Sequence, residues 1–596
     1  MSLHFDEKKT RSYTVDIFGN EHDVAPYFEV QSLIKKIPDK CESEEIEIMY
    51  QSEVNKPTVF RIPIEFLSDI KMFTNVCFTN YFLFLPSRAS LIQSEIILEL
   101  SKIKKENQIK YENKSIGWFD YNGQDVFLMD EKTLPDGTKF SCIRDMGKWV
   151  DGDVKKYDEM LTKYVYPNHR MSLAYILGFS GVLVARISKL KDLGVVLSGI
   201  SGQSTTGKTT AIKLMASIWA DPDDVKGRII MRADASNIGF NAQFAGFNGP
   251  CIIFDDVDQN STLDLANKLN TLSRGAQRVV ANQKGEAQFN RMGFGGICVF
   301  VSECPLLEKT RKESGLYPRF IDLQDIVWTD DSESAEAIKS ICSQNFGFKG
   351  KIFAEFIEKK TNKQLCSIYD SAYKFINDIT TEKDNFTARA NKKYACIIAT
   401  ANLLMDCFGI VFDIEEIAKI LMVNEKLNRE ERDKGTQTYD YLKQFFIENH
   451  ASFNLIGEEQ QLSAKGYMNL KSAYGIAVFK QNKLHLYIKV ATVDEILTKA
   501  GFNQLSNYKR VWKEKGWTMC AKDRFDCSTT TLMPCRHFHF VYPDYDKQIR
   551  NFVYIFRTQF EYGTNVEYGK NSEIIVLSRD LWLTSEEQDK LKIQIR

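Results

Sequence analysis

The stretch GISGQSTTGKTTAIKL, residues 199–214, carries residue types that could hold the phosphates of a nucleotide. Gly202, four intervening residues, and then Gly207, Lys208 and Thr209 have the spacing of a phosphate-binding loop, or P-loop. In such a loop backbone N–H groups cradle the phosphates at the start of a helix, the lysine reaches the β and γ oxygens, and the threonine ligates Mg²⁺. We therefore expect ATP and Mg²⁺ as cofactors. The expected nucleotide contacts are Gly202, Ser204, Thr205, Thr206, Gly207, Lys208, Thr209 and Thr210.

The sequence on both sides of this loop predicts the turn from strand to helix that a phosphate site needs. LGVVLSG, just before it, is short and apolar, as a buried parallel strand would be. KTTAIKLMASIWA, just after it, spaces its apolar residues at helical intervals. A chance glycine turn is the alternative interpretation, and it is disfavoured because strand, loop and helix all agree.

A pair of aspartates follows a second apolar run, PCIIFDDVDQ. Side chains at the C-terminal ends of parallel strands gather at the ligand-binding edge of an α/β sheet. We expect Asp255 to hold the metal and Asp256 to polarise the attacking water. Adjacent aspartates in a turn are otherwise simply solvated, but a strand of this kind downstream of a P-loop favours the site.

Two more polar residues stand at strand ends. The apolar strand in GGICVFVSEC is expected to end at Ser302, which could hydrogen-bond the attacking water or the γ-phosphate. Alternatively, Ser302 only caps the end of the strand. LYPRFIDL places Arg319 just before an apolar strand. Hydrolysing ATPases need positive charge on the γ-phosphate in the transition state, and a neighbouring subunit's arginine often supplies it. Solvation of a turn is the plainer role for Arg319.

The segment AQRVVANQKGEAQFNRMGF predicts a β-hairpin between the aspartate pair and Ser302. Its runs at 278–282 and 287–291 flank a turn that contains Lys284. A solvent-exposed turn lysine is the alternative to a functional one.

The C-terminal region predicts a helix, a tight turn, a second basic helix and a pair of strands, which is the order of a winged helix. The second helix would carry the duplex DNA contacts Lys509, Arg510 and Lys513, although basic helices are more often just solvated. A nearby group of cysteines and histidines could supply metal ligands. It contains no C-x-x-C pair, however, and polar and apolar residues alternate in HFHFVY as they would in a plain β-strand. That group is Cys520, Cys527, Cys535, His537 and His539.

Composition describes an ordinary folded protein, with 43% hydrophobic and 26% charged residues. The formal net charge of −1 excludes a general polycation, so contacts with nucleic acid must come from local basic patches. The N-terminal residues are unlike a secretory signal, and the uncharged apolar stretch 171–185 is shorter than the ~20 residues of a membrane span. We expect a cytoplasmic protein without a membrane partner.

The pattern of elements indicates a multidomain α/β protein. A charged segment near residue 430 is the best linker candidate, and its alternative is the solvated end of a helix. The expected parts are an α+β N-terminal domain (1–115), a β-rich connecting segment (116–163), an α/β ATPase core (164–328), a helical lid (329–430) and a winged-helix DNA-binding domain (431–596).

The order of these motifs resembles that of an AAA+ ATPase. PRF is similar to the arginine-finger motif of the MCM helicase clade, and TARANKKYACIIATANLL is similar to its sensor-2 helix, which implies Arg389 as a second sensor. GWFDYNGQDVFLMD, GQSTTGKTT and the lid resemble a domain of unknown function from phage and mobile-element replication proteins. Within that group the pattern is similar to the MCM-like replicative helicases of staphylococcal cassette chromosome elements. The resemblance covers residues 115–430 well, the C-terminal part moderately and the first 115 residues poorly.

This resemblance implies a ring-forming ATPase, hexameric in the family, that unwinds DNA to replicate a mobile genetic element. Single-stranded DNA would pass through the channel, where Lys284 would touch a backbone phosphate, and duplex DNA would bind at the winged helix. Two positions depart from the family pattern. Gly207 stands where MCM proteins usually have alanine, and Asp256 stands where most AAA+ proteins have glutamate, which shortens the base by one methylene.

Two other classes of function fit part of the sequence. In a DNA-binding regulator ATP would act only as a switch, without unwinding. A P-loop phosphotransferase would act on a small substrate, but PRF and the lid helix would then have no purpose.

Overall fold

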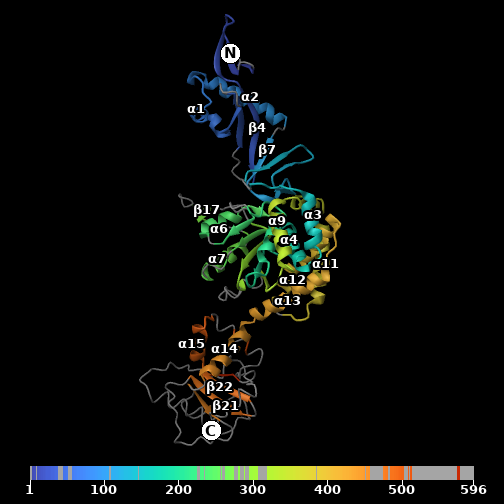
Figure 1. The fold of residues 1–596 in the computed structure, drawn as a ribbon. Helices are drawn as coiled ribbons and strands as arrows, with labels where there is room; N and C mark the ends of the chain where they lie inside the picture. Colours follow the sequence, from blue (N-terminus) through green and yellow to red (C-terminus); the bar gives the residue numbers. More distant parts are fainter. Residues whose placement is uncertain are drawn as a thin grey trace, which may run out of the picture. The chain divides into compact units, whose positions relative to one another are not determined.

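The chain forms two compact units, and the main boundary between them falls between Leu427 and Asn428. Figure 1 shows the computed structural model. The structure describes residues 3–7, 10–37, 44–51, 57–106, 109–144, 147–223, 229–233, 235–255, 257, 262–273, 275, 280–281, 287–288, 294–306, 319–383, 386–449, 452–456, 474–480, 483–502, 508, 511–512 and 574–577.

The N-terminal part combines sheets with two helices, as an α+β domain does. On α2 (Ala89–Lys105), Ile92, Ile96 and Leu100 recur at helical spacing and pack in one core with apolar residues of the strands. A three-stranded sheet consists of β1 (His4–Asp6), β2 (Arg11–Val15) and β3 (Glu21–Pro26). The helix α1 (Ile70–Thr79) lies in the same part of the chain. The larger sheet has the order β10-β11-β7-β4-β5-β6, with bounds Glu131–Thr133, Lys139–Cys142, Ile109–Asn113, Phe28–Ile37, Glu44–Gln51 and Pro57–Pro63.

The β-rich segment 116–163 is divided between two sheets. Its strands β10 and β11 extend the N-terminal sheet, because β11 pairs in parallel with β7. Its strands β8 (Ile116–Tyr121) and β9 (Gln124–Leu128) instead form a small sheet with β14 (Phe247–Asn248) of the core. The N-terminal sheet therefore continues past residue 115, where the sequence pattern placed the end of the domain.

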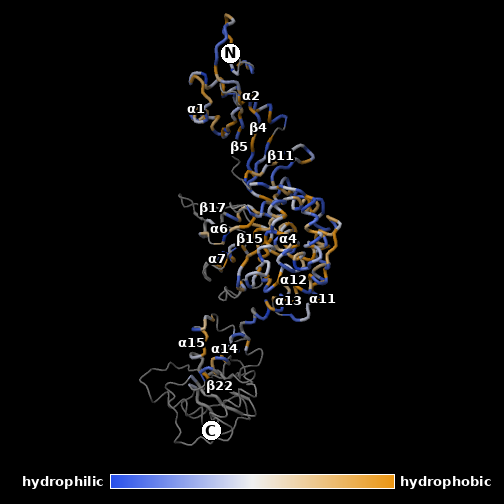
Figure 2. The backbone as a smooth tube through the Cα atoms, viewed as in Figure 1, coloured by the Kyte–Doolittle hydropathy of each residue, from blue (hydrophilic) through white to orange (hydrophobic). Residues whose placement is uncertain are grey.

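The core is a five-stranded parallel sheet with the order β13-β15-β18-β12-β19. The four strands other than the edge strand β13 are buried almost throughout and mostly apolar, as strands covered on both faces must be, and Figure 2 shows the hydrophobic stretch at β15. Two helices, α5 (Lys208–Ser217) and α7 (Thr262–Ser273), follow the strands β12 and β15. The strand bounds are Ile230–Arg232 (β13), Ile252–Asp255 (β15), Ile297–Ser302 (β18), Val196–Ser201 (β12) and Phe320–Gln324 (β19).

The helix α4 (His169–Lys191) is long and apolar enough to cross a membrane by length and composition alone. Of its 18-residue window with mean hydropathy 1.6, however, 83% is buried inside the protein. The helix packs against α5, β18 and three helices of the region that follows the sheet, α10 (Gly350–Glu358), α11 (Asn362–Ile379) and α12 (Thr387–Phe408). The helix therefore forms part of the core of the α/β domain.

A helical region follows the last core strand. Its first helix, α9, is capped by Asp331, and α11 begins with a capping box between Thr361 and Gln364. The helix α12 is followed by Gly409, which caps its C-terminus in the left-handed conformation (φ 66°). The bounds are Ser332–Gln344 (α9), Gly350–Glu358 (α10), Asn362–Ile379 (α11), Thr387–Phe408 (α12) and Ile414–Arg432 (α13).

In the second unit, described strands form a sheet with the order β20-β21-β22-β23. Trp512 is fully buried, and its indole N–H donates a hydrogen bond to the carbonyl of Gly435 at 2.7 Å. The elements are α14 (Lys434–Asn449), β20 (Phe453–Ile456), β21 (Gly475–Lys480), β22 (Lys483–Lys489), α15 (Val490–Lys499) and β23 (Ile574–Leu577). The strand pair expected after the basic helix lies outside the described residues.

Candidate nucleotide-binding site

The P-loop connects β12 to α5, as the sequence predicts. Gly202 (φ 144°), Thr205 (φ 76°) and Gly207 (φ 85°) have positive φ angles, which turn the backbone sharply between the strand and the helix. A Cβ atom at Gly207 would lie 2.8 Å from Thr329 Oγ1 and 3.1 Å from Thr329 N. This crowding is a physical reason for glycine at the position where MCM proteins usually have alanine.

Lys208 is folded back onto its own loop. Its Nζ donates hydrogen bonds to the carbonyls of Gly202 at 2.5 Å and Gln203 at 2.8 Å. The lysine follows the left-handed Gly207 directly and begins α5, so its ammonium group lies where the helix N-terminus adds positive potential. These carbonyl contacts hold the ammonium group in the loop, from where it can turn to an anionic ligand.

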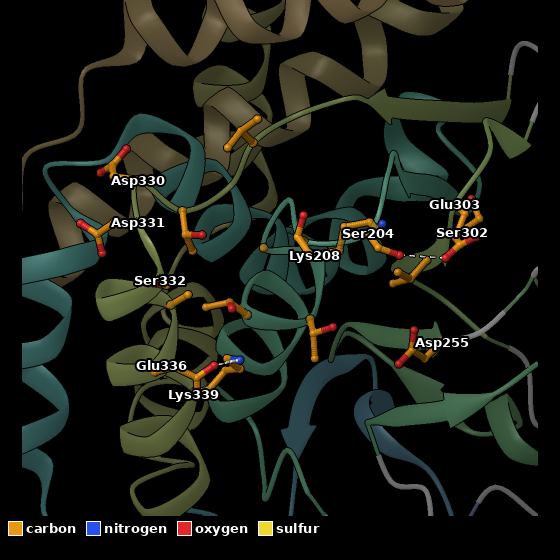
Figure 3. A pocket seen from close by; sticks show the side chains of 18 residues that line it. Ser204, Lys208, Asp255, Ser302, Glu303, Asp330, Asp331, Ser332, Glu336 and Lys339 are labelled. Atoms are coloured by element: carbon orange, nitrogen blue, oxygen red, sulfur yellow. Dashed lines mark hydrogen bonds and ion pairs between the residues drawn. The ribbon is translucent and has the colours of Figure 1, made fainter.

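A cavity of about 820 Å³ lies over the P-loop, within the size range of small-molecule sites. Figure 3 shows Lys208 and Ser204 between two groups of side chains, with Asp255 and Ser302 on one side and Asp330 and Asp331 on the other. The sequence-predicted residues that line it are Ser204, Thr205, Gly207, Lys208, Thr209, Thr210, Asp255 and Ser302. Gly202, Thr206, Arg319 and Arg389 are not among its lining residues.

Asp255 and Ser302 reach the cavity because their strands end at the same edge of the sheet. The strand β18, which ends in Ser302, lies between β12 and β15, and β15 ends in Asp255. Ser302 is buried, and its hydroxyl donates to the carbonyl of Cys304 at 2.6 Å. This hydrogen bond is the contact expected if Ser302 only caps the end of the strand. The position of the serine on the cavity is what we expect if Ser302 contacts the attacking water or the γ-phosphate.

Sequence reasoning missed a second wall of the cavity, formed by residues 327–339. Asp331 caps α9 by accepting a hydrogen bond from the backbone N–H of Ser334, and this bond holds the pKa of the Asp331 carboxyl below its usual value. Asp330 forms an ion pair with Arg170 at 2.5 Å, and Glu336 pairs with Lys339. The run TDDSE could have indicated a helix start. Nothing in its spacing indicates that this helix faces the P-loop.

Glu303 is another lining residue that the sequence did not single out. Its Oε1 accepts a hydrogen bond from Ser204 Oγ at 3.0 Å, which ties the loop after β18 to the P-loop. Glu303 directly follows Ser302, so the strand-end rule that selected the serine could have extended to it.

Arg319 lies at the opposite end of the sheet from the P-loop. It directly precedes β19, which runs parallel to β12, and the length of a five-residue strand, roughly 16 Å, separates it from the phosphate end. Its side chain is exposed and donates from Nη1 to Ser273 Oγ at 3.2 Å. Arg389 is exposed in the first turn of α12.

Other predicted residues lie outside the described part of the chain. The strands β16 (Val280–Ala281) and β17 (Ala287–Gln288) pair antiparallel on either side of the turn that contains Lys284, but the turn itself is not described. Among the described residues no group of three or more His, Cys, Asp or Glu could hold a metal ion. The undescribed predictions are Asp256, Lys284, Lys509, Arg510, Lys513 and the possible metal group Cys520, Cys527, Cys535, His537 and His539.

Comparisons with known proteins find two matched domains in the chain. Two family models match parts of the chain: a domain of unknown function (DUF927) at residues 89–292 and the Cch helix turn helix domain at residues 433–532. No curated protein matches the chain. The first match spans the P-loop and Asp255, and the second spans the predicted basic helix.

The fold is that of a multidomain α/β protein. Among solved structures, the SCCmec type IV Cch active helicase matches with a TM-score of 0.69 and 17% sequence identity, over 88% of this chain and 95% of that one. The resemblance to staphylococcal cassette helicases is therefore confirmed at the level of the fold.

Proposed function

We propose that the chain is an ATP-dependent DNA helicase of the ring-forming AAA+ type that replicates a mobile genetic element. One observation carries the proposal: the strand that ends in Ser302 lies between the strand of the P-loop and the strand of Asp255. This order gathers a phosphate-binding lysine, a carboxylate and a polar hydroxyl on one cavity, which is the set that ATP hydrolysis needs. The fold match to an active helicase supports the same class.

The lining residues fit a nucleotide with its metal. Thr209 is exposed in the first turn of α5, and both Thr209 and Asp255, the last residue of β15, line the cavity, so a hydroxyl and a carboxylate of the kind that Mg²⁺ prefers lie on one site. When bound, the metal neutralises charge on the phosphates. Lys208 would exchange its loop carbonyls for β and γ oxygens, and Asp256 would polarise the attacking water.

Assembly into a ring, taken as hexameric, would complete the site. Arg319 lies too far from its own P-loop to reach a phosphate there, and its exposed position supports a role in the site of a neighbouring subunit. Arg389 would act as a second sensor. The helical region after β19 would then be the AAA+ lid.

DNA contacts would lie in two places. The Cch helix turn helix match includes the positions of Lys509, Arg510 and Lys513, which supports duplex binding by a winged helix. The hairpin of β16 and β17 would present Lys284 to single-stranded DNA in the channel. A cytoplasmic location fits both partners, ATP and DNA.

The test is to mix the pure protein with a forked DNA and ATP, with Lys208→Ala as the inactive control. ATP-dependent strand separation by the wild type alone supports the helicase. Tight DNA binding without separation would instead indicate the ATP-switched regulator, and neither activity would indicate the phosphotransferase.

A further inference from the structure

A buried carboxylate in the core sheet joins three segments around the nucleotide cavity. Asp322 lies in β19 and is fully buried. Its Oδ1 accepts a hydrogen bond from Ser201 Oγ at 3.1 Å, and its Oδ2 accepts one from the backbone N–H of Leu306 at 2.7 Å. Burial of a charge is costly unless its oxygens are hydrogen-bonded. These two contacts therefore fix the position of the carboxylate.

The two partners of Asp322 flank the residues that line the cavity. Ser201 is the last residue of β12, directly before Gly202, and Leu306 follows Ser302 by four positions. On β12 there is no room for a side chain at Gly199, because a Cβ atom there would overlap the Asp322 carboxylate. A single side chain thus holds β19, the entry to the P-loop and the loop after β18 together.

The chain after Asp322 stays in contact with the P-loop. The backbone N–H of Asp325 donates to the carbonyl of Ser201 at 2.9 Å, and that of Trp328 donates to the carbonyl of Thr206 at 2.8 Å. Thr329 then packs against Gly207. A shift of β19 along its axis would therefore move the P-loop with it.

Arg319 directly precedes the other end of β19 and is exposed. We propose that Asp322 is a positioning residue that couples the strand carrying Arg319 to the P-loop of the same subunit. ATP bound against Arg319 in one site then changes hydrolysis in the next site, through Ser201 and Leu306. This inference rests on the proposed sharing of each site between two subunits.

The test is a mixing experiment at saturating ATP, so that a change in affinity does not appear in the readout. Wild-type subunits are mixed with increasing fractions of Lys208→Ala subunits, and ATP hydrolysis is measured. Without coupling, activity falls in proportion to the fraction of inactive subunits. With coupling it falls more steeply.

The same series is repeated in subunits that carry Ser201→Ala or Asp322→Ala. Ser201→Ala removes one of the two hydrogen bonds and keeps the carboxylate. Asp322→Ala removes both hydrogen bonds. The matched control is Ser198→Ala on the same strand, because Ser198 Oγ is buried and finds no hydrogen-bond partner among the described residues. Thermal unfolding of each variant confirms that it is folded.

We expect a steep decline for the wild type and Ser198→Ala, and a decline close to proportional for Ser201→Ala and Asp322→Ala. A proportional wild-type curve, or variant curves as steep as the wild type, would overturn the coupling. A parallel mixture of Arg319→Ala with Lys208→Ala distinguishes the two proposals. Recovered hydrolysis there with unchanged steepness rejects only the role of Asp322, whereas no recovery rejects the shared site and the coupling with it.

Discussion

The two walls of the nucleotide cavity differ in how far apart along the chain their contacts lie. The contacts of the P-loop wall join residues that are close in sequence, since Lys208 donates hydrogen bonds to the carbonyls of Gly202 and Gln203. The opposite wall depends on residues distant in sequence: the carbonyl of Trp328 accepts a hydrogen bond from Asn168 Nδ2 at 3.1 Å. Local spacing fixes the phosphate contact, whereas tertiary packing shapes the rest of the cavity.

The largest loss of ATP hydrolysis is expected from a substitution in the P-loop itself. Lys208→Ala should abolish ATP hydrolysis, since it removes the charge that faces the phosphates. The unfolding temperature should change little, because Lys208 lies on the cavity and not in the core. Lys213→Ala is the matched control, since this lysine of the same helix pairs with Asp223 at 2.6 Å. Hydrolysis near the wild-type rate in Lys208→Ala would show that the P-loop assignment is wrong.

If Arg319 of a neighbouring subunit completes the site that the two walls form, inactive variants should complement each other when they are mixed. Arg319→Ala should be inactive by itself, as arginine fingers contribute on the order of 10³-fold or more. Mixed with Lys208→Ala, it should regain some hydrolysis, because certain interfaces then pair an intact P-loop with an intact arginine. The readout is the ATPase rate of the mixture against each variant alone. No recovery while subunits demonstrably exchange would count against the shared site.

The contact between the two walls can be tested at Gly207. Gly207→Ala should weaken ATP binding and lower stability by about 1–2 kcal/mol, because the residue has a left-handed φ and its Cβ would press on Thr329. Adding Thr329→Ala removes the hydroxyl at 2.8 Å but leaves the backbone nitrogen at 3.1 Å, so we expect partial rescue. Titration with a fluorescent ATP analogue and thermal unfolding measure both effects. Equal behaviour of Gly207→Ala and the wild type would mean that the walls are not packed against each other.

The smallest effect is expected at the start of α9 in the second wall. Because the folded-state pKa of Asp331 is lowered, its contribution to stability is present above the unfolded-state pKa and is lost as the pH falls through the folded-state value. Asp331→Ala should therefore lower the unfolding temperature slightly at neutral pH and hardly at all in strong acid. Asp331→Asn keeps a good helix cap and should lose only the pH dependence. An unchanged pH profile in Asp331→Asn would contradict this account.

Much of the candidate site could be predicted because its residues are marked by local rules. Gly202, Gly207 and Lys208 are recognised by spacing, and Asp255 and Ser302 by their places at the ends of apolar strands. The strand order then brings Lys208, Asp255 and Ser302 to one cavity.

The rest could not be predicted, because it depends on pairings that leave no local pattern. Strands β10 and β11 join the N-terminal sheet through β7, although they follow β8 and β9, which form a separate sheet with β14 of the core. Asp322 reads as one polar residue in an apolar strand, and only the parallel register of β19 with β12 brings it to Ser201. The expected winged-helix residues and Lys284 stay predictions, since they lie outside the described residues.

The central claim, that ATP hydrolysis performs work on DNA, is tested most directly by measuring hydrolysis and strand separation of a forked DNA in the same sample. For the wild type we expect both to rise together with ATP concentration. In Lys284→Ala, DNA-free hydrolysis should persist while separation falls far more, because each subunit that grips the strand loses a phosphate contact worth on the order of 1 kcal/mol or less. A mutant that separates strands at the wild-type rate would make Lys284 an ordinary turn lysine. Saturated hydrolysis by the wild type with no strand separation would contradict the account itself.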